Sequence, residues 1–501
     1  MRRLLAALLL IVAAPSAAVD RPPDTLLSGQ ISRADHQSYR EVPFTLPPGT
    51  DRLLVELSLD HLEQRTVMDV GVADPNGFRG ASGSNKRRIL IGETEATPSY
   101  LPGAMAAGPW KLILAVPNIR EGVTANWQAR LWFLKPGEPD EAPPTAGRGP
   151  GWYRGDMHLH SAHSDGSCAP EGGAPKVPCP LFLTLQTASA RGLDFVSLTE
   201  HNSVSHHSTL REAQPYFPKL LLIPGREITT FFGHFNIHGV TRPIDFRIAP
   251  AEKGGTTSFN AVADEVHRLG GLLVINHPAM PSDERCMGCG WTMPGADPTK
   301  VDAIETVNGG AIAGVDNRVA GLVDGTPFWA GWLAANGPVT AIGASDNHDG
   351  TARDDRLGTI GRPATVVLAG DLTWPALREG LKKGRAFIDA EGVPGRHLDF
   401  TATSGKAQAV MGGTLQASSG TVRLSIDVDA PVGSRLRLFD GRTLLSEQPL
   451  AGGRQQLALS PELAPGRHQL RLDVVRDGQP ILLSNALLVD SGRSKKSSPH
   501  N

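Results

Sequence analysis

The stretch RGDMHLHSAHSDG, residues 154–166, gathers three histidines and two aspartates into one short segment. In an extended strand, residues two apart point to the same face, so His158 and His160 can both be directed at one point. A pair of imidazoles placed in this way is a typical metal-ligand arrangement. On its own, such a pair fits solvated or core histidines as well as it fits a metal site.

Four later segments repeat this design, and each follows a short hydrophobic run. They read TEHN (199–202), PGREIT with GH shortly after it (224–234), NHP (276–278) and SDNH (345–348). Polar side chains at these positions lie where a strand is expected to end. Five such segments together favour one shared polar site over five unrelated ones.

The central region, from residue 151 to 393, alternates strand-like and helix-like segments. Helices are predicted over 181–192, 259–271 and 327–337, and each precedes an apolar strand. This alternation predicts parallel strands, and so an α/β fold. Polar clusters at the strand ends predict a TIM-like barrel, because catalytic groups of such barrels gather at the carboxyl-end face.

The order of the five motifs resembles the PHP (polymerase and histidinol phosphatase) superfamily of metallohydrolases, most closely its exported CehA/McbA branch. The resemblance implies a distorted (β/α)7 barrel and two or three divalent metal ions, with zinc, manganese and iron as the candidates. One ion would bind the first two histidines of the motif. Matched motif by motif, the implied metal ligands are His158, His160, Asp165, His201, Glu227, His234, His277, Asp346 and His348.

Three further residues are predicted to be catalytic. Glu200 departs from the T-D-H pattern usual in the family, and a longer carboxylate there can still orient His201. His163 lies between the strongest ligands and either protonates a leaving group or is a solvated loop histidine. Asn276 flanks a ligand and can donate a hydrogen bond to an oxyanion. Asp156 either orients a ligand in the same manner as Glu200 or caps the turn.

The resemblance implies an exported metal-dependent hydrolase of ester bonds, in which a hydroxide bridging two metals attacks a phosphorus or carbonyl centre. Phosphomonoesters or phosphodiesters are the first expectation, and an aryl carbamate or carboxylic ester of the CehA/McbA type is the alternative. The sequence has no G-x-S-x-G motif, which weighs against a serine esterase. A third, non-enzymatic alternative is a metal- or envelope-binding protein.

The flanking regions have other patterns. Residues 1–18, MRRLLAALLLIVAAPSAA, are predicted to be a signal peptide. Short strands with Pro-Gly and Asn-Gly turns predict a β-sandwich over 19–134, followed by a linker over 135–150. A second β-sandwich is predicted over 394–489 and a disordered tail over 490–501. The sandwiches serve either as stabilising appendages or as modules that contact the envelope or a glycan.

Composition limits the partners and the location. The net charge is −2 and no basic block is present, so nucleic acid is not expected to bind, whereas a small-molecule ester is. The signal peptide, without a later membrane-spanning run, predicts a periplasmic or secreted protein. That oxidising destination favours disulfides over a zinc site, with the pairing left open between local loops and a cross-link. The cysteines are Cys168, Cys179, Cys286 and Cys289.

Overall fold

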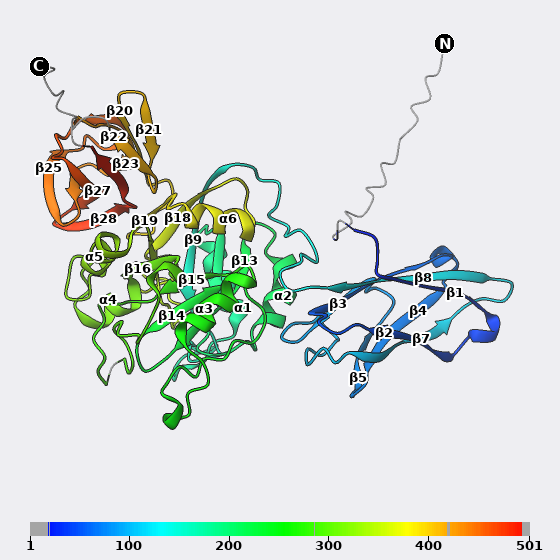
Figure 1. The fold of residues 1–501 in the computed structure, drawn as a ribbon. Helices are drawn as coiled ribbons and strands as arrows, with labels where there is room; N and C mark the ends of the chain where they lie inside the picture. Colours follow the sequence, from blue (N-terminus) through cyan, green and yellow to red (C-terminus); the bar gives the residue numbers. More distant parts are fainter. Residues whose placement is uncertain (1–18, 20, 285, 418–420, 493–501) are drawn as a thin grey trace, which may run out of the picture. The chain divides into compact units, whose positions relative to one another are not determined.

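The structure of the chain is a computed structural model. It describes residues 19, 21–284, 286–417 and 421–492. The predicted signal peptide (1–18) and the last nine residues of the predicted tail lie outside the described residues. The described chain is a mixed α/β structure with many strands and few helices (Figure 1). Among the described residues, no helix has both the length and the apolar character needed to cross a membrane.

The chain divides into two compact units. The first comprises Met1–Gly92 and Ser99–Ala142, and the second comprises Glu93–Pro98 and Pro143–Asn501. The change of unit after Ala142 lies within the predicted linker. All the predicted site residues belong to the second unit.

The first unit contains two antiparallel four-stranded sheets. Stacked rings of Phe44 and Phe133, one from each sheet, lie 6.4 Å apart, so apolar faces of the two sheets meet. The Asp-Pro-Asn-Gly turn is held by Asp74, whose carboxylate accepts from the backbone of Asn76 and Gly77. The sheets run β1 (Thr25–Ser32), β8 (Thr124–Leu134), β3 (Arg52–Leu59), β6 (Arg88–Gly92), and β2 (Ser38–Leu46), β7 (Gly108–Asn118), β4 (Val67–Asp74), β5 (Gly77–Ser82).

The second unit is built on a long sheet whose strands end at the predicted motifs. Its strands are almost wholly buried, as expected for short β-branched and apolar runs covered on both faces. Along the sheet the order is β17 (Thr340–Ala344), β16 (Ala303–Asn308), β15 (Leu272–Ile275), β14 (His234–His238), β13 (Leu221–Thr229), β12 (Phe195–Leu198), β9 (Gly151–Leu159), β18 (Ala364–Ala369) and β19 (Ala386–Asp389).

The expectation of parallel strands is right for part of this sheet and wrong for the rest. Strands β9, β12 and β13 are parallel, as are β15, β16 and β17. Strand β14 is antiparallel to both its neighbours, and β18 is antiparallel to β9. The reason at β14 is its connection: only four residues, 230–233, join it to β13, and so short a turn can form only a hairpin.

Three of the helices lie where the sequence predicts them, each before a strand. Helix α1 (Leu181–Ala190) precedes β12, α3 (Phe259–Arg268) precedes β15, and α5 (Thr326–Asn336) precedes β17. Helix α3 shows the local cause: Ser258 caps its first turn, and its apolar stripe is buried. The remaining helices are α2 (His207–Ala213), α4 (Gly309–Val315) and α6 (Trp374–Lys382).

The ends of β9 and β17 also meet, although they are far apart in the strand order. Leu159 and Asn347 form a parallel bridge, and the His160 N–H donates to the Asn347 carbonyl over 3.0 Å. The sheet therefore curls until the first motif of the chain lies beside the last. This contact positions the site described below.

The C-terminal region is hydrogen-bonded to the central sheet. Strand β19 pairs with β28, so the sheet continues into the C-terminal strands. These strands share one apolar core with a second sheet, and residues on both sides of position 393 belong to one compact unit. The continuing strands are β28 (Gln479–Ser484), β27 (Gly466–Arg476), β24 (Arg435–Asp440), β25 (Thr443–Pro449), β22 (Thr414–Ala417) and β29 (Leu487–Ser491), and the second sheet is β21 (Ala407–Val410), β20 (His397–Ser404), β23 (Arg423–Ala430) and β26 (Gly453–Leu459).

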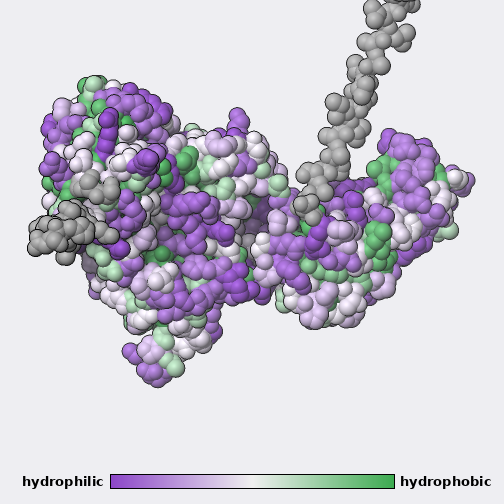
Figure 2. Space-filling view, turned by 45° about the horizontal axis from the view of Figure 1, so that its top comes forward, coloured by the Kyte–Doolittle hydropathy of each residue, from purple (hydrophilic) through white to green (hydrophobic). Residues whose placement is uncertain are grey.

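The visible surface is mainly hydrophilic, with small apolar patches between the polar side chains (Figure 2). Isolated exposed apolar residues are normal on a water-exposed surface. Two of the exposed apolar residues, Phe231 and Met287, are 81% and 79% accessible. Phe231 lies in the turn just before His234, and Met287 lies in the loop that carries His277.

Candidate metal centre

The structure brings the nine predicted ligands together from the ends of neighbouring strands. His158 is on β9 and His160 directly follows it, and both are buried. Glu227 is on β13 and His234 begins β14. The other ligands come from loops that follow β9, β12, β15 and β17. These are Asp165, His201, His277, Asp346 and His348.

Glu227 lies at the centre of the group. Its Oε2 is 3.2 Å from His158 Nε2 and 3.0 Å from His201 Nδ1. Its Oε1 is 3.3 Å from His234 Nδ1 and 3.4 Å from His277 Nε2. A fifth imidazole, that of His160, has its Nε2 3.6 Å from Oε2. One carboxylate thus faces five imidazoles, three on Oε2 and two on Oε1. This arrangement suits a carboxylate that contacts two cations at once.

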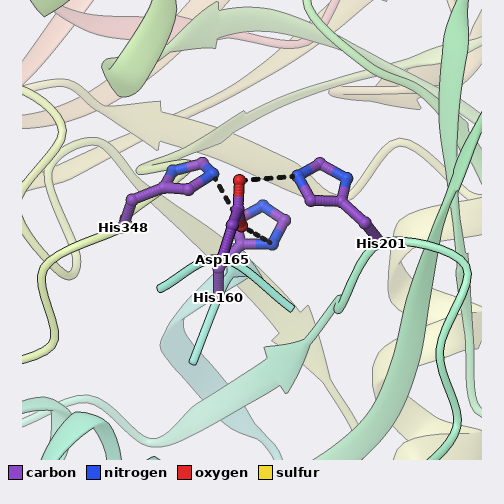
Figure 3. Close-up of side chains that lie close together, drawn as sticks. All are labelled: His160, Asp165, His201 and His348. Atoms are coloured by element: carbon purple, nitrogen blue, oxygen red, sulfur yellow. Dashed lines mark ion pairs between the residues drawn. The ribbon is translucent and has the colours of Figure 1, made fainter. Parts of the chain in front are cut away.

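Asp165 occupies a similar position among three imidazoles, two of which also face Glu227 (Figure 3). Its carboxylate oxygens lie 3.5 Å from His201 Nε2, 3.3 Å from His348 Nε2 and 3.9 Å from His160 Nδ1. One donor atom from each of these four residues lies within 4.8 Å of the others. The Asp165 side chain is 56% exposed, so this part of the site faces solvent.

Asp346 links the two groups. Its Oδ1 lies 3.3 Å from His158 Nε2 and 3.2 Å from His160 Nε2. The Asp346 backbone has φ +51°, and that of His277 has φ +26°, both unusual for residues with a Cβ. Gly310 permits the close approach at Asp346, because an added Cβ would lie 2.8 Å from the Asp346 carbonyl oxygen. Strained backbone of this kind gathers at functional sites.

Glu305, on β16, is a site residue that the sequence motifs do not reveal. Its Oε1 lies 2.7 Å from His158 Nδ1, and its Oε2 accepts from the His277 N–H over 3.1 Å. Asn308 donates to the same Oε2. Glu305 therefore orients one predicted ligand through its ring and another through its backbone. The only signal in the sequence is a lone carboxylate in the apolar run AIETVN.

Asn276 contacts Glu227. Its side-chain amide donates to Glu227 Oε1 over 2.9 Å and to Asn236 Oδ1 over 2.9 Å, and the residue is buried. These contacts hold the Glu227 carboxylate in place. The oxyanion-donor role remains a prediction.

Glu200 and His163 lie beside the cluster, outside the groups of possible metal ligands among the described residues. Glu200 is buried and accepts from the hydroxyls of Ser161 and Ser164, both over 2.5 Å. It therefore braces the turn that carries Asp165. His163 Nδ1 lies 2.8 Å from Ser205 Oγ. The catalytic roles of both residues remain predictions.

Asp156 braces the strand ends. Its carboxylate accepts from the backbone N–H groups of Ser345, over 3.0 Å, and Gly361, over 2.7 Å. It also accepts from the His158 N–H over 3.3 Å. Burial raises the pKa of Asp156 to about 6, although these hydrogen bonds lower it. Asp156 thus orients a ligand and joins β9 to the segment after β17.

The site is strongly coupled electrostatically. Burial lowers the pKa of His158, but the carboxylates of Asp346, Glu305 and Glu227 raise it well above the usual value. Burial also lowers the pKa of His201, but Glu227 and Asp165 raise it to about 10. His160 behaves differently, because burial and the neighbouring imidazoles lower its pKa to about 3.

Two cysteine pairs lie in loops near the site. Cys168 is paired with Cys179, and Cys286 with Cys289. The structure thus has local disulfides in place of a cross-link between the two segments. One of these sulfurs, Cys289 Sγ, lies beside His277 and His234. Free thiols are absent from the part of the chain that the structure describes.

The residues present fit a metal cluster. His160 Nε2 and His234 Nε2 are buried without a hydrogen-bond partner, which is costly unless something else uses the nitrogen. Mixed imidazole and carboxylate donors are the ligand set of zinc, manganese and iron. Three groups of side chains have donor atoms within 4.8 Å of one another, and the two without a cysteine could each hold an ion while the Cys286–Cys289 bond is closed. The groups are His160, Asp165, His201 and His348; His158, His160 and Glu227; and His234, His277 and Cys289.

We expect metal binding to displace protons. In the metal-free site Asp165 and Asp346 raise the pKa of His348 to about 9 against the effect of burial, and that of His201 is about 10. Both imidazoles are therefore protonated at pH 7, whereas a metal ligand must be neutral. Apparent metal affinity should rise as the pH is raised toward 9, by about tenfold per unit for each proton displaced.

This expectation is checked by calorimetric titration with Zn²⁺ at pH 7 in buffers of different ionisation enthalpy. The dependence of the heat on the buffer gives the number of protons released. Release of protons, with weaker binding at pH 6 than at pH 8, is the expected result. Binding without proton release would contradict the placement of the metal at these histidines.

Comparisons with known proteins give no family assignment. No family model matches the chain, and no curated protein matches it. A solved two-domain protein from Bacteroides vulgatus, which contains a predicted PHP-like metal-dependent phosphoesterase, is similar over 68% of this chain and 96% of its own, with 19% identity and a TM-score of 0.38. An FMN-binding β-glucuronidase from Facaelibacterium prausnitzii aligns over 92% of this chain and 91% of its own, with 9% identity and a TM-score of 0.18. The function of this chain is therefore inferred from its own site.

Proposed function

We propose that the second unit is a metal-dependent hydrolase of ester bonds, with phosphomonoesters or phosphodiesters as its first substrates. The observation that carries the proposal is the convergence of nine imidazole and carboxylate side chains around Glu227 and Asp165. Divalent ions bound there would activate water as a nucleophile and stabilise charge on the attacked oxygen. A purely structural metal site needs about four ligands and no open side.

The exposure of the ligands indicates where substrate enters. The side chains of Asp165, His348 and His201 are 56%, 39% and 29% exposed. Those of His158 and Glu227 are at most 1% exposed and lie beneath them. Substrate therefore reaches the site from the side of Asp165, and the buried residues hold the ligand geometry while excluding water.

Several finer features belong to the same proposal. The motif order supports membership of the PHP superfamily, and the bridge between Leu159 and Asn347 supports a closed, distorted seven-fold barrel. The CehA/McbA branch and the boundaries of the flanking β-sandwich domains rest on the sequence patterns. Export is supported by the two disulfides, since such bonds persist in oxidising compartments.

One observation favours the alternative substrate class, an aryl carbamate or carboxylic ester. Phe231 is 81% exposed in the turn between β13 and β14, two residues from Thr229 and three from His234. Thr229 Oγ1 lies 2.9 Å from His201 Nδ1, so this turn adjoins the site. An exposed ring there offers a face to an aromatic leaving group.

The test is a panel of esters offered to the full chain after reconstitution with Zn²⁺, Mn²⁺ or Fe²⁺. The panel contains p-nitrophenyl phosphate, bis-p-nitrophenyl phosphate and a 1-naphthyl carbamate. Metal-dependent hydrolysis of either phosphate supports the proposal, and hydrolysis of the carbamate alone supports the alternative. With metal bound and no ester cleaved, the chain would be a metal-binding protein without this activity. His158→Ala should lose the activity, whereas His267→Ala, on α3, should keep it.

Glu305 gives a separate prediction. Glu305→Gln should lower metal affinity by ~10–100-fold, because His158 loses the anionic partner of its Nδ1. The measurement is a competition titration against a chelator. Glu379→Gln, an exposed carboxylate on α6, is the matched control and should bind metal as the wild type does. Unchanged affinity in Glu305→Gln would show that this contact does not orient His158.

A further inference from the structure

The segment Cys286-Met287-Gly288-Cys289 packs against two of the predicted metal ligands. Cys289 is 3% exposed, and its Sγ lies 3.6 Å from His277 Nδ1 and 4.0 Å from His234 Nδ1. The loop is anchored beside the β13–β14 turn, where Thr292 N–H donates to the Phe232 carbonyl over 2.8 Å. The sulfur is thus held against the two rings.

The side chains of His234, His277 and Cys289 form a possible set of metal ligands. One donor atom each from His234, His277 and Cys289 lies within 4.8 Å of the others, and all three residues are buried. Two imidazoles and a thiolate are a donor set suited to zinc and to softer ions.

The same two histidines also face Glu227. His277 presents Nε2 to Glu227 and Nδ1 to Cys289, on opposite sides of its ring. His234 directs Nδ1 toward both Glu227 and Cys289. A metal shared with Glu227 and a metal shared with Cys289 therefore compete for Nδ1 of His234, whereas His277 faces the two positions with different nitrogens. Whether the ion binds beside Glu227 or beside Cys289 depends on whether Cys289 has a free thiolate.

We propose that the Cys286–Cys289 disulfide is a redox control on this metal centre. With the bond closed, Cys289 has no thiolate to offer, and His234 and His277 serve the position next to Glu227. With the bond opened, Cys289 becomes a metal ligand together with His234 and His277. The inference rests on the proposed metal-dependent function and adds a regulated, sulfur-containing site to it.

The chemistry balances as thiol–disulfide exchange with a dithiol reductant. The dithiol gives two electrons and two protons, the S–S bond breaks, and the reductant becomes a cyclic disulfide while both cysteines become thiols. Cys289 then releases its proton as its sulfur bonds to the ion. After loss of the metal, exchange with a small-molecule disulfide restores the Cys286–Cys289 bond, and that disulfide takes up the two electrons and two protons and leaves as two thiols. Hydrolysis should be slower in the reduced form, because His234 Nδ1 has left the Glu227 position.

The test is a Co²⁺ titration of the full chain, read by the sulfur-to-cobalt charge-transfer absorption. The oxidised chain should bind Co²⁺ without this absorption. The chain reduced with dithiothreitol and then freed of it under argon should show the absorption, and removal of the reductant matters because dithiothreitol itself binds Co²⁺ through sulfur. Cys286→Ser, which leaves Cys289 as a thiol, should show it without reductant and should bind Zn²⁺ on the order of tenfold more tightly than Cys289→Ser. The double variant Cys168→Ser/Cys179→Ser removes the other disulfide and should behave as the wild type does.

The outcomes separate this inference from the proposed function. One outcome is that Co²⁺ binds to both the oxidised and the reduced chain while neither the reduced chain nor Cys286→Ser gives the absorption. That result would overturn the proposal that Cys289 becomes a metal ligand, and it would leave the proposed hydrolytic centre intact. If no Co²⁺ binds in either state, both proposals fail. If circular dichroism shows that Cys286→Ser does not fold, the absorption of the reduced wild-type chain with Co²⁺ decides whether Cys289 binds the ion. Absorption that persists in reduced Cys289→Ser would assign the sulfur to another cysteine and overturn the inference.

Discussion

Glu227→Gln should remove metal binding and hydrolysis together. The carboxylate is buried and faces five imidazoles, so the substitution takes away the one anionic group that they share. Loss of an outer partner of a metal ligand costs ~10–100-fold in affinity, and loss of this central group should cost more than about 100-fold. Activity should fall at least as far, because the reaction depends on the metal.

The measurement is elemental analysis of purified Glu227→Gln, with hydrolysis assayed on the best ester of the panel. Glu265→Gln, at an exposed carboxylate of α3, is the matched control and should keep both metal and activity. Circular dichroism separates loss of metal from loss of fold. A folded Glu227→Gln variant with a full metal complement would contradict the central position assigned to Glu227.

Asp156→Ala should have the largest effect on stability. The substitution leaves the buried N–H groups of His158, Ser345 and Gly361 without their acceptor. An unsatisfied buried donor costs about 1–3 kcal/mol, so the free energy of unfolding should fall by about 3 kcal/mol or more at pH 5. Because the three donors lie on separate segments, the curled end of the sheet should loosen, and metal affinity should fall with it.

The stability lost in Asp156→Ala should depend on pH, with the larger loss at acid pH. Burial raises the pKa of Asp156 in the folded chain to about 6, above its ordinary value. Its contribution to stability is therefore present in full at acid pH and diminishes as the pH rises through 6. The difference between wild type and Asp156→Ala should be larger at pH 5 than at pH 8. Asp156→Asn keeps one carbonyl oxygen, so its free energy of unfolding at pH 5 should fall less than that of Asp156→Ala. An equal fall in both variants would argue against the bracing role of Asp156.

The sequence predicts which side chains come together better than it predicts the strand directions of the sheet. His158 and His160 are recognisable because alternate residues of a strand share a face, and the other ligands because they follow apolar runs. The structure brings these side chains together. The reversal at β14 is not evident from the sequence, because a four-residue turn between GREIT and HFNIH does not look different from a bend within a strand.

Other features depend on contacts between distant residues, and no local pattern reveals them. Glu305 lies in an apolar strand without a motif, and its role appears only where its carboxylate meets His158. Cys289 is one of four cysteines whose pairing the sequence left open, and its position beside His277 depends on the packing of a loop. The pairing of β19 with β28, which joins the C-terminal region to the central sheet, is likewise a contact between segments far apart in the chain.

The most direct test of the account is an anomalous-scattering measurement on crystals of the full chain grown with Mn²⁺ or Zn²⁺. The account predicts anomalous peaks on both sides of the Glu227 carboxylate, at about 2.0–2.2 Å from its oxygens and from the facing imidazole nitrogens. Anomalous density found only at the protein surface, with the nine side chains still in hydrogen bonds and ion pairs with one another, would contradict the proposed metal centre.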